Sequence, residues 1–170
     1  AVVHYWNEPE PIRATQGNQP GDLCPGYDLQ VITKDGVLDE TIDPTKSGKV
    51  TVINFWGTWC TPCVAELPYF EQIAQEYKDT VQVVAVHTHL VNETAPAYIG
   101  NKYPDATMIF AKDYPIDEQG LVGGYYSTLG GRGTYPYTVI LDEKGIITKV
   151  FVSSLTYDEL KVAVENALNP

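Results

Sequence analysis

The stretch FWGTWCTPC, residues 55–63, contains two cysteines, Cys60 and Cys63, separated by two residues. Such a pair can be part of a zinc site, a structural disulfide or a redox couple. A zinc site needs four ligands, and because the sequence has no second CxxC, the third cysteine and a histidine would have to join the pair. A structural disulfide that closes so short a ring constrains little of the unfolded chain. The spacing therefore favours redox exchange, and no metal is expected.

The residues around the pair predict a strand, a cysteine turn and a helix. KVTVINFW is a continuous β-rich run typical of a strand buried on both faces, and the apolar residues of TPCVAELPYFEQIAQEYKD recur at helical spacing. Cys60 then lies just before the first helical turn, where free backbone N–H groups and the helix dipole favour a thiolate. Cys63 lies three residues later, inside the helix. We expect Cys60 to be an exposed nucleophile and Cys63 its resolving partner.

Strand-like and helical runs alternate along the rest of the chain. In the closing helix, Thr156 and Glu159 match a capping box. Strands that alternate with helices and end in a hairpin predict an α/β domain with a mixed sheet. The predicted elements are a hairpin at about 27–42, a strand at VQVVAVHT, a short helix over 92–103 capped by Asn92, a strand at ATMIFAKD, a helical turn around 119–126, a hairpin over YTVILDEKGIITKVF and a closing helix at TYDELKVAVENAL.

Length and charge limit the classes of protein to consider. The 170 residues suit one domain, which we place at residues 21–170 after a polar arm or tether at residues 1–20. Lys and Arg number 11 against 22 Asp and Glu, so the net charge of −11 would repel nucleic acid and anionic lipid. No stretch approaches the ~20 apolar residues that cross a bilayer. Because the chain begins with Ala1, we expect a processed product or a trimmed chain, from which a signal peptide or anchor could have been removed.

The segment NFWGTWCTPCVAELPYF, residues 54–70, resembles the active-site segment of the thioredoxin superfamily. The resemblance is strongest to the TlpA/ResA/DsbE-like branch of extracytoplasmic thiol–disulfide oxidoreductases, and it extends more loosely over about residues 21–168, including GDLCPGYDL and YPYTVILDEKG. It implies a thioredoxin-like fold with a mixed central sheet flanked by helices, an N-terminal β-hairpin and a central insertion. It implies no cofactor.

The resemblance also assigns roles to residues near the cysteines. Glu66 matches a glutamate that affects the cysteine pKa values and proton transfer in ResA-like proteins, although it could instead be a solvated helix carboxylate. Pro136 matches a cis-proline that faces the cysteines and leaves the backbone of Tyr135 free to pair with an extended substrate. Trp59 is expected at the surface as an apolar substrate contact, whereas Trp56 is expected in the core. Thr61 and Pro62, between the cysteines, complete the predicted substrate-binding residues.

Other residues have two interpretations each. His87 and His89 are expected to be hydrogen-bonded histidines at a strand end, with proton exchange near the active site as the alternative. Cys24 is expected to be a small half-buried filler, with a third redox thiol as the alternative. The tyrosines of GGYYSTLGGRGTYPY either shape a substrate groove or fill the space left by glycines.

The function that the resemblance implies is a monomeric, membrane-tethered or secreted thiol–disulfide oxidoreductase. Its substrates would be protein disulfides, for example those of apocytochrome c, and a membrane electron donor of the CcdA/DsbD type would restore the dithiol. One alternative is a thiol peroxidase of the same fold, although WCTPC lacks the usual Pro-Thr-x-x-Cys context. The other is a peptide-binding module without turnover.

Overall fold

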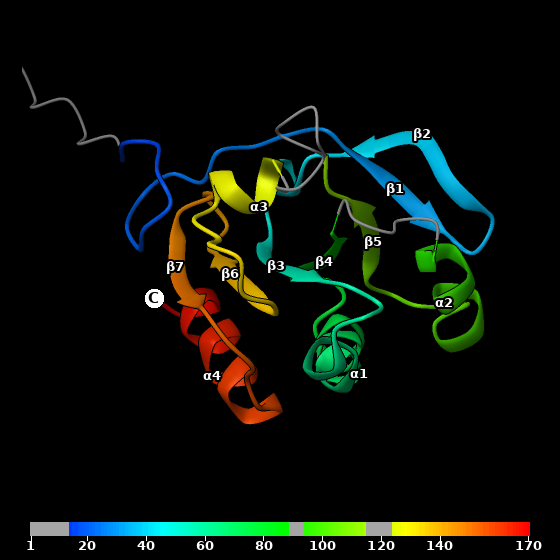
Figure 1. The fold of residues 1–170 in the computed structure, drawn as a ribbon. Coiled ribbons are helices and arrows are strands. Elements are labelled where there is room, and N and C mark those ends of the chain that lie inside the picture. The colour runs from blue at the N-terminus through cyan, green and yellow to red at the C-terminus, as the bar shows by residue number, and fades with distance from the viewer. Residues whose placement is uncertain (1–13, 89–93, 115–123) are drawn as a thin grey trace, which may run out of the picture.

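A seven-stranded mixed sheet organises the residues that the computed structural model describes, which are 14–88, 94–114 and 124–170. The strands lie in the order β2-β1-β5-β4-β3-β6-β7 (Figure 1). Strands β3, β4 and β5 run parallel to one another, and the other pairings are antiparallel. The strands are β1 (Leu29–Thr33), β2 (Gly36–Ile42), β3 (Val50–Trp56), β4 (Val81–His87), β5 (Ile109–Lys112), β6 (Tyr137–Leu141) and β7 (Ile147–Phe151).

Helices cover both faces of this sheet (Figure 1). On one face, α1 (Thr61–Glu76), α2 (Ala95–Lys102) and α4 (Tyr157–Leu168) pack on side chains such as Val52 and Trp56 of β3. On the other face, α3 (Gly124–Thr128) packs on Ile53 and Phe55. Because successive side chains of a strand point to opposite faces, β3 contributes to both cores and is buried along its whole length.

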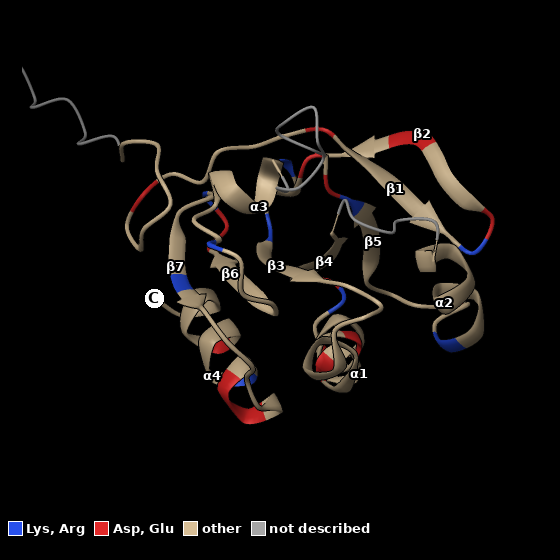
Figure 2. Ribbon diagram, viewed as in Figure 1, with Lys and Arg blue, Asp and Glu red and all other residues tan. Residues whose placement is uncertain are grey.

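Charged residues avoid the centre of the sheet. Figure 2 shows them on helices, on loops and on the strands β2, β5 and β7, and β3, β4 and β6 contain none. None of the described helices is long and apolar enough to span a membrane.

Most of the predicted elements are confirmed. The N-terminal hairpin is β1–β2, the closing hairpin is β6–β7, and the run before the cysteines is the central strand β3. The capping box of α4 is also confirmed, because Thr156 accepts the N–H of Glu159 and the Glu159 carboxylate accepts the N–H of Thr156. These features depend on short-range hydrophobic periodicity and on helix-capping residues, both of which can be recognised directly in the sequence.

Three boundaries differ from the prediction. The strand predicted at ATMIFAKD begins only at Ile109, because the buried carboxylate of Glu71 accepts the N–H groups of Thr107 and Met108. The predicted cap of the helix over 92–103 is wrong: α2 begins at Ala95 with Thr94 at its N-cap, a start that suits a proline in the first helical turn, and Asn92 lies outside the described residues. The turn predicted around 119–126 is the short helix α3, which continues to Thr128, and residues 119–123 also lie outside the described residues.

Candidate active site

The two cysteines lie where β3 leads into α1, at the carboxyl end of the parallel strands. Cys60 is the N-cap residue of α1, and Cys63 N–H donates a hydrogen bond to Cys60 Sγ over 3.3 Å. The two residues form a disulfide, with their Cα atoms 5.2 Å apart. Pro62 fits in the first turn of α1, where its missing N–H removes no helical hydrogen bond. The helix start therefore directs a backbone donor at the sulfur of Cys60.

The exposure of the cysteines corrects one expectation. Cys60 was predicted to be exposed, but only 5% of its surface is accessible in this disulfide form, against 0% for Cys63. The physical reason is that Cys60, bonded to the buried Cys63, packs within the core cluster beneath α1. Cys60 is still the more accessible of the two.

The loop before β6 lies next to the cysteine turn. Phe55 near the end of β3 pairs with Tyr137 at the start of β6, so the residues just before Tyr137 and just after β3 meet at one edge of the sheet. The Tyr135–Pro136 peptide bond is cis, as the resemblance implied. The rings of Tyr135 and Trp59 lie edge to face with their centres 5.7 Å apart. The cis-proline loop is thus held beside the residue that precedes Cys60.

The predicted substrate-binding residues differ in exposure. Trp59 is 52% exposed, and Thr61 and Pro62 are exposed as well. Tyr135 is half-buried and Pro136 is buried. Among the described residues, no hydrogen bond engages the backbone N–H or C=O of Tyr135. The surface around the disulfide therefore combines an exposed indole with a backbone segment that can accept a partner.

Glu66 is buried on the same helix as the cysteines. Only 2% of its surface is accessible, and its Oε2 accepts the N–H of Leu155 over 3.0 Å, whereas Oε1 has no hydrogen-bond partner among the described residues. Burial raises the pKa of this carboxyl to about 7, an effect that the hydrogen bond from Leu155 partly opposes. Residues three apart on a helix are neighbours, so Glu66 lies on the same side of α1 as Cys63. The alternative of a solvated carboxylate is wrong.

We predict that Glu66 makes the stability of the protein depend on pH. Its pKa is raised from 4.5 to about 7 in the folded state, so its contribution is fully present below about pH 4.5 and is lost as the pH rises through about 7. After allowance for solvent screening, the free energy of unfolding should fall by about 1–3 kcal/mol over this range. Urea denaturation of the wild type and Glu66→Gln at a series of pH values measures this change. In Glu66→Gln, most of this decrease in the free energy of unfolding should be absent. An equal dependence of the unfolding free energy on pH in both proteins would contradict the prediction. Glu143→Gln, which removes a carboxylate from an exposed turn, is the control.

The histidine at the end of β4 is structural, as expected. His87 is fully buried; its Nδ1 donates to the C=O of Thr88 over 2.8 Å, and its Nε2 accepts the N–H of Thr58 over 3.2 Å. Its ring also meets Trp56, which is fully buried, as predicted for a core residue. His87 therefore holds the turn that leads to Cys60 through its hydrogen bond with the backbone of Thr58. His89 lies outside the described residues.

The third cysteine lies in the other core. Cys24 is 4% exposed and belongs to the cluster between the sheet and α3, whereas Cys60 and Cys63 belong to the cluster beneath α1. Burial raises the pKa of its thiol to about 12. A protonated, buried thiol on the opposite face of the sheet fits the filler interpretation and not that of a third redox thiol. In the described part of the chain, no group of three or more His, Cys, Asp or Glu residues is arranged to hold a metal ion.

One functional neighbour had no signal in the sequence. Asp113, just after β5, is fully buried, and its carboxylate accepts the N–H groups of Tyr114, Tyr125 and Tyr126. Its own N–H donates to the C=O of His87. Asp113 thereby anchors α3 to the end of the sheet that carries the cysteines. A single aspartate in AKDYP does not reveal such a role, because two of its three partners, Tyr125 and Tyr126, follow more than ten residues later.

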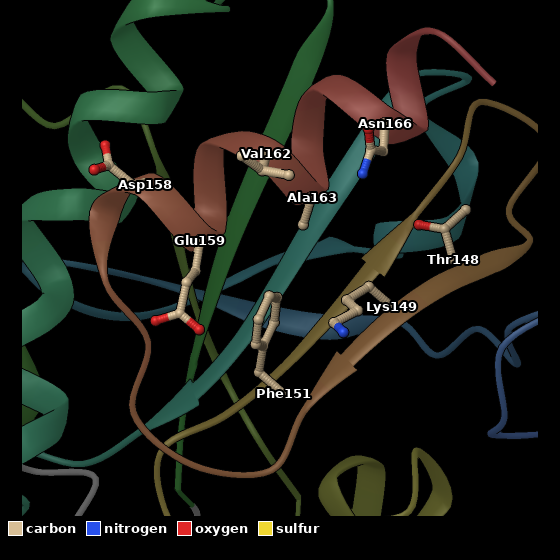
Figure 3. Close-up of a pocket in the computed structure, with 8 residues that line it drawn as sticks. All are labelled: Thr148, Lys149, Phe151, Asp158, Glu159, Val162, Ala163 and Asn166. Carbon is tan, nitrogen blue, oxygen red and sulfur yellow. The ribbon is translucent and has the colours of Figure 1, made fainter.

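A separate hollow lies far from this chemistry in the fold. It has a volume of about 430 Å³ and lies between β7 and α4 (Figure 3). Phe151, Val162 and Ala163 give it an apolar floor, and Lys149 Nζ lies 5.3 Å from the centre of the Phe151 ring. Every residue that lines it belongs to β7 or α4, and none belongs to the cysteine turn or the cis-proline loop. It is therefore not part of the disulfide site.

A mixed sheet with a CxxC disulfide at a helix start and a cis-proline loop beside it defines a thioredoxin-like protein. A family model described as Redoxin matches residues 19–167. The chain belongs to the Redoxin family.

Curated relatives specify the activity within this family. The chain is 32% identical over 151 residues to the thioredoxin-like protein YneN of Bacillus subtilis, covering 85% of this chain and 78% of YneN. It is also 32% identical over 143 residues to the thiol-disulfide oxidoreductase ResA of Oceanobacillus iheyensis, covering 83% and 69%. Together with the Cys60–Cys63 disulfide, these relatives identify the protein as a thiol–disulfide oxidoreductase.

Solved structures show the same fold. A Chlorobium tepidum protein described as thiol:disulfide interchange protein DsbE matches with a TM-score of 0.68 and 23% identity over 92% of this chain and 100% of its own. StoA from Bacillus subtilis matches with a TM-score of 0.61 and 24% identity over 82% and 96%. The thioredoxin-like fold predicted from the sequence is confirmed.

Proposed function

We propose that the protein reduces disulfides of extracytoplasmic proteins, with Cys60 as the attacking thiolate and Cys63 as the resolving thiol. The observation that supports this assignment is the position of Cys60 as N-cap of α1, where Cys63 N–H points at its sulfur. Backbone donors and the helix dipole stabilise a thiolate at such a position. Cys63 is wholly buried and is bonded to the sulfur of Cys60, which suits a resolving thiol.

The proposed reaction is a pair of thiol–disulfide exchanges. The Cys60 thiolate attacks one sulfur of the substrate disulfide, a Cys60–substrate bond forms, and the other substrate sulfur leaves as a thiolate and takes a proton. Cys63 then loses its proton and attacks Cys60 Sγ, which releases the second substrate thiol and leaves the Cys60–Cys63 disulfide. Two electrons have passed to the substrate. A dithiol donor must reduce the protein again.

Glu66 is proposed to exchange the proton of the resolving step. Its pKa of about 7 means that it can hold or release a proton near neutral pH, and it is the next titratable group along the buried side of α1 from Cys63. Its Oε1 has no hydrogen-bond partner among the described residues, so one oxygen is free to take part. An ionised Glu66 would also raise the pKa values of the cysteines by charge repulsion.

The substrate is proposed to bind as an extended peptide along Tyr135. Its backbone N–H and C=O are without hydrogen bonds among the described residues, which suits addition of a strand from the partner. Trp59, Thr61 and Pro62 would contact the residues that flank the substrate cysteine, and the cis form of Pro136 would present Tyr135 to them.

The location and partners are proposed from the resemblance and the relatives. A structural neighbour from Mycobacterium tuberculosis is described as a secreted disulfide oxidoreductase, and one from Streptococcus pneumoniae as an exposed lipoprotein thioredoxin. We propose that this protein is likewise extracytoplasmic, that residues 1–20 tether a catalytic domain at 21–170, and that it works as a monomer. A membrane donor of the CcdA/DsbD type would supply its electrons.

The reduction potential of the Cys60–Cys63 couple tests the direction of the reaction. Equilibration with glutathione or dithiothreitol should give a value nearer the roughly −270 mV of thioredoxin than the roughly −120 mV of DsbA. The protein should also reduce insulin with repeated turnover. A potential near that of DsbA would make it an oxidant. Binding without turnover would favour a peptide-binding module, and consumption of peroxide would favour a thiol peroxidase.

A further inference from the structure

The loop that leads into the cis-proline is rich in glycine and exposed. Gly130 and Gly133 have positive φ angles of 95° and 94°, which glycine adopts without strain. Gly133 and Thr134 are exposed and directly precede Tyr135. Because glycine loses more backbone entropy than other residues on becoming ordered, contacts from elsewhere in the fold must hold this loop.

The side chain of Tyr126 makes several of those contacts. Its hydroxyl accepts the N–H of Gly133 over 2.8 Å and donates to the C=O of Thr134 over 2.7 Å. Its ring stacks on the ring of Tyr135, with the centres 4.5 Å apart and the planes 12° apart. A Cβ atom on Gly131 would collide with the Tyr126 ring, so the glycine leaves the space that the ring occupies. The side chain of Tyr126 therefore contacts three successive residues of the loop, Gly133, Thr134 and Tyr135.

Tyr126 is itself fixed to the core of the domain. It is 3% exposed, and its ring meets the edges of Phe55 and Tyr137 with ring centres 5.6 and 5.7 Å away. Its backbone N–H donates to Asp113 Oδ2 over 3.2 Å. The Tyr126 ring thus connects the core between the sheet and α3 to the loop before the cis-proline.

We propose that Tyr126 is a positioning residue that makes the site selective for polypeptide disulfides over small ones. This inference rests on the proposed function, in which the backbone of Tyr135 pairs with an extended peptide. Pairing requires the N–H and C=O of Tyr135 to be held in one orientation before the substrate arrives. A small disulfide needs only the sulfur of Cys60, so its reduction does not depend on that orientation.

Tyr126→Phe tests the proposal, because it removes the hydroxyl and keeps the stacked ring. Two substrates are compared: a short cysteine-containing peptide dimerised through its disulfide, and hydroxyethyl disulfide. For the peptide we expect KM to rise about tenfold with little change in kcat, since the loop must now be ordered on binding. Neither the kinetics with hydroxyethyl disulfide nor the reduction potential of the Cys60–Cys63 couple should change.

Tyr125→Phe is the matched control. Tyr125 is the adjacent buried tyrosine of α3, and its hydroxyl donates to the C=O of Pro25 over 2.9 Å, away from the cis-proline loop. The Tyr125→Phe substitution should lower the melting temperature about as much as Tyr126→Phe does, and it should leave the KM for the peptide unchanged. Gly131→Ala, which displaces the Tyr126 ring, should raise the peptide KM as Tyr126→Phe does.

The outcomes separate this inference from the proposed function. An unchanged peptide KM in Tyr126→Phe, an equal loss on both substrates, or an equal effect of Tyr125→Phe would overturn the role of Tyr126 while reduction itself stands. If the wild-type protein reduces neither disulfide, the proposed function fails and the inference fails with it.

Discussion

Replacement of Cys60 by serine is expected to abolish disulfide reduction, with a loss of at least about a thousandfold in turnover. The thiolate is the nucleophile, and a serine hydroxyl at a helix N-cap is not ionised at neutral pH. The fold should be retained, because serine is a favoured N-cap residue and can accept the Cys63 N–H as the sulfur does. Insulin reduction measures the loss, and circular dichroism checks the fold.

Cys63→Ser should instead trap the protein on its substrate. Cys60 can still attack, but no second thiol resolves the mixed disulfide, so a covalent adduct through Cys60 should accumulate and be visible by mass spectrometry. Cys24→Ser is the control and should keep nearly normal activity, since Cys24 lies in the other core. Full turnover by Cys63→Ser, or an adduct on Cys24, would contradict the two-cysteine mechanism.

Glu66→Gln is expected to lower the pKa of Cys60 in the reduced protein. An ionised carboxylate near the thiol opposes formation of a second negative charge, so removing it should lower this pKa by about one unit. The effect should depend on pH. Below about pH 7 the wild-type Glu66 is protonated and the two proteins should behave alike, whereas above this pH the variant should hold more thiolate.

Thiolate absorbance titrated against pH, in parallel with the rate of exchange, measures this difference. The amide of the variant can still accept the N–H of Leu155, so the packing of α1 against the loop before α4 should be preserved. Glu143→Gln controls for the loss of one surface charge. Superimposable curves for wild type and Glu66→Gln would show that the buried carboxyl does not interact with the cysteines.

The chemistry of the cysteine pair was accessible from the sequence. CxxC between a buried-strand pattern and a helical pattern predicts the N-cap position of Cys60, because strand and helix periods are local properties. The same holds for the two hairpins and for the capping box at Thr156 and Glu159, whose partners lie within a few residues. The cis form of the Tyr135–Pro136 bond came from resemblance, since nothing local to TYPYT distinguishes it from a trans turn.

Only the tertiary structure decided the environment of the site. The pKa of Glu66 depends on burial beneath the loop that carries Leu155, which is 89 residues away in the sequence. The start of β5 depends on Glu71 of α1, and the loop before the cis-proline is hydrogen-bonded by Tyr126, whose own N–H donates to Asp113. Desolvation and hydrogen bonding are set by whichever groups meet in space, whatever their separation along the chain. Local pattern therefore determined which residues could react, and packing of distant segments determined their exposure, their pKa values and the surface that meets the substrate.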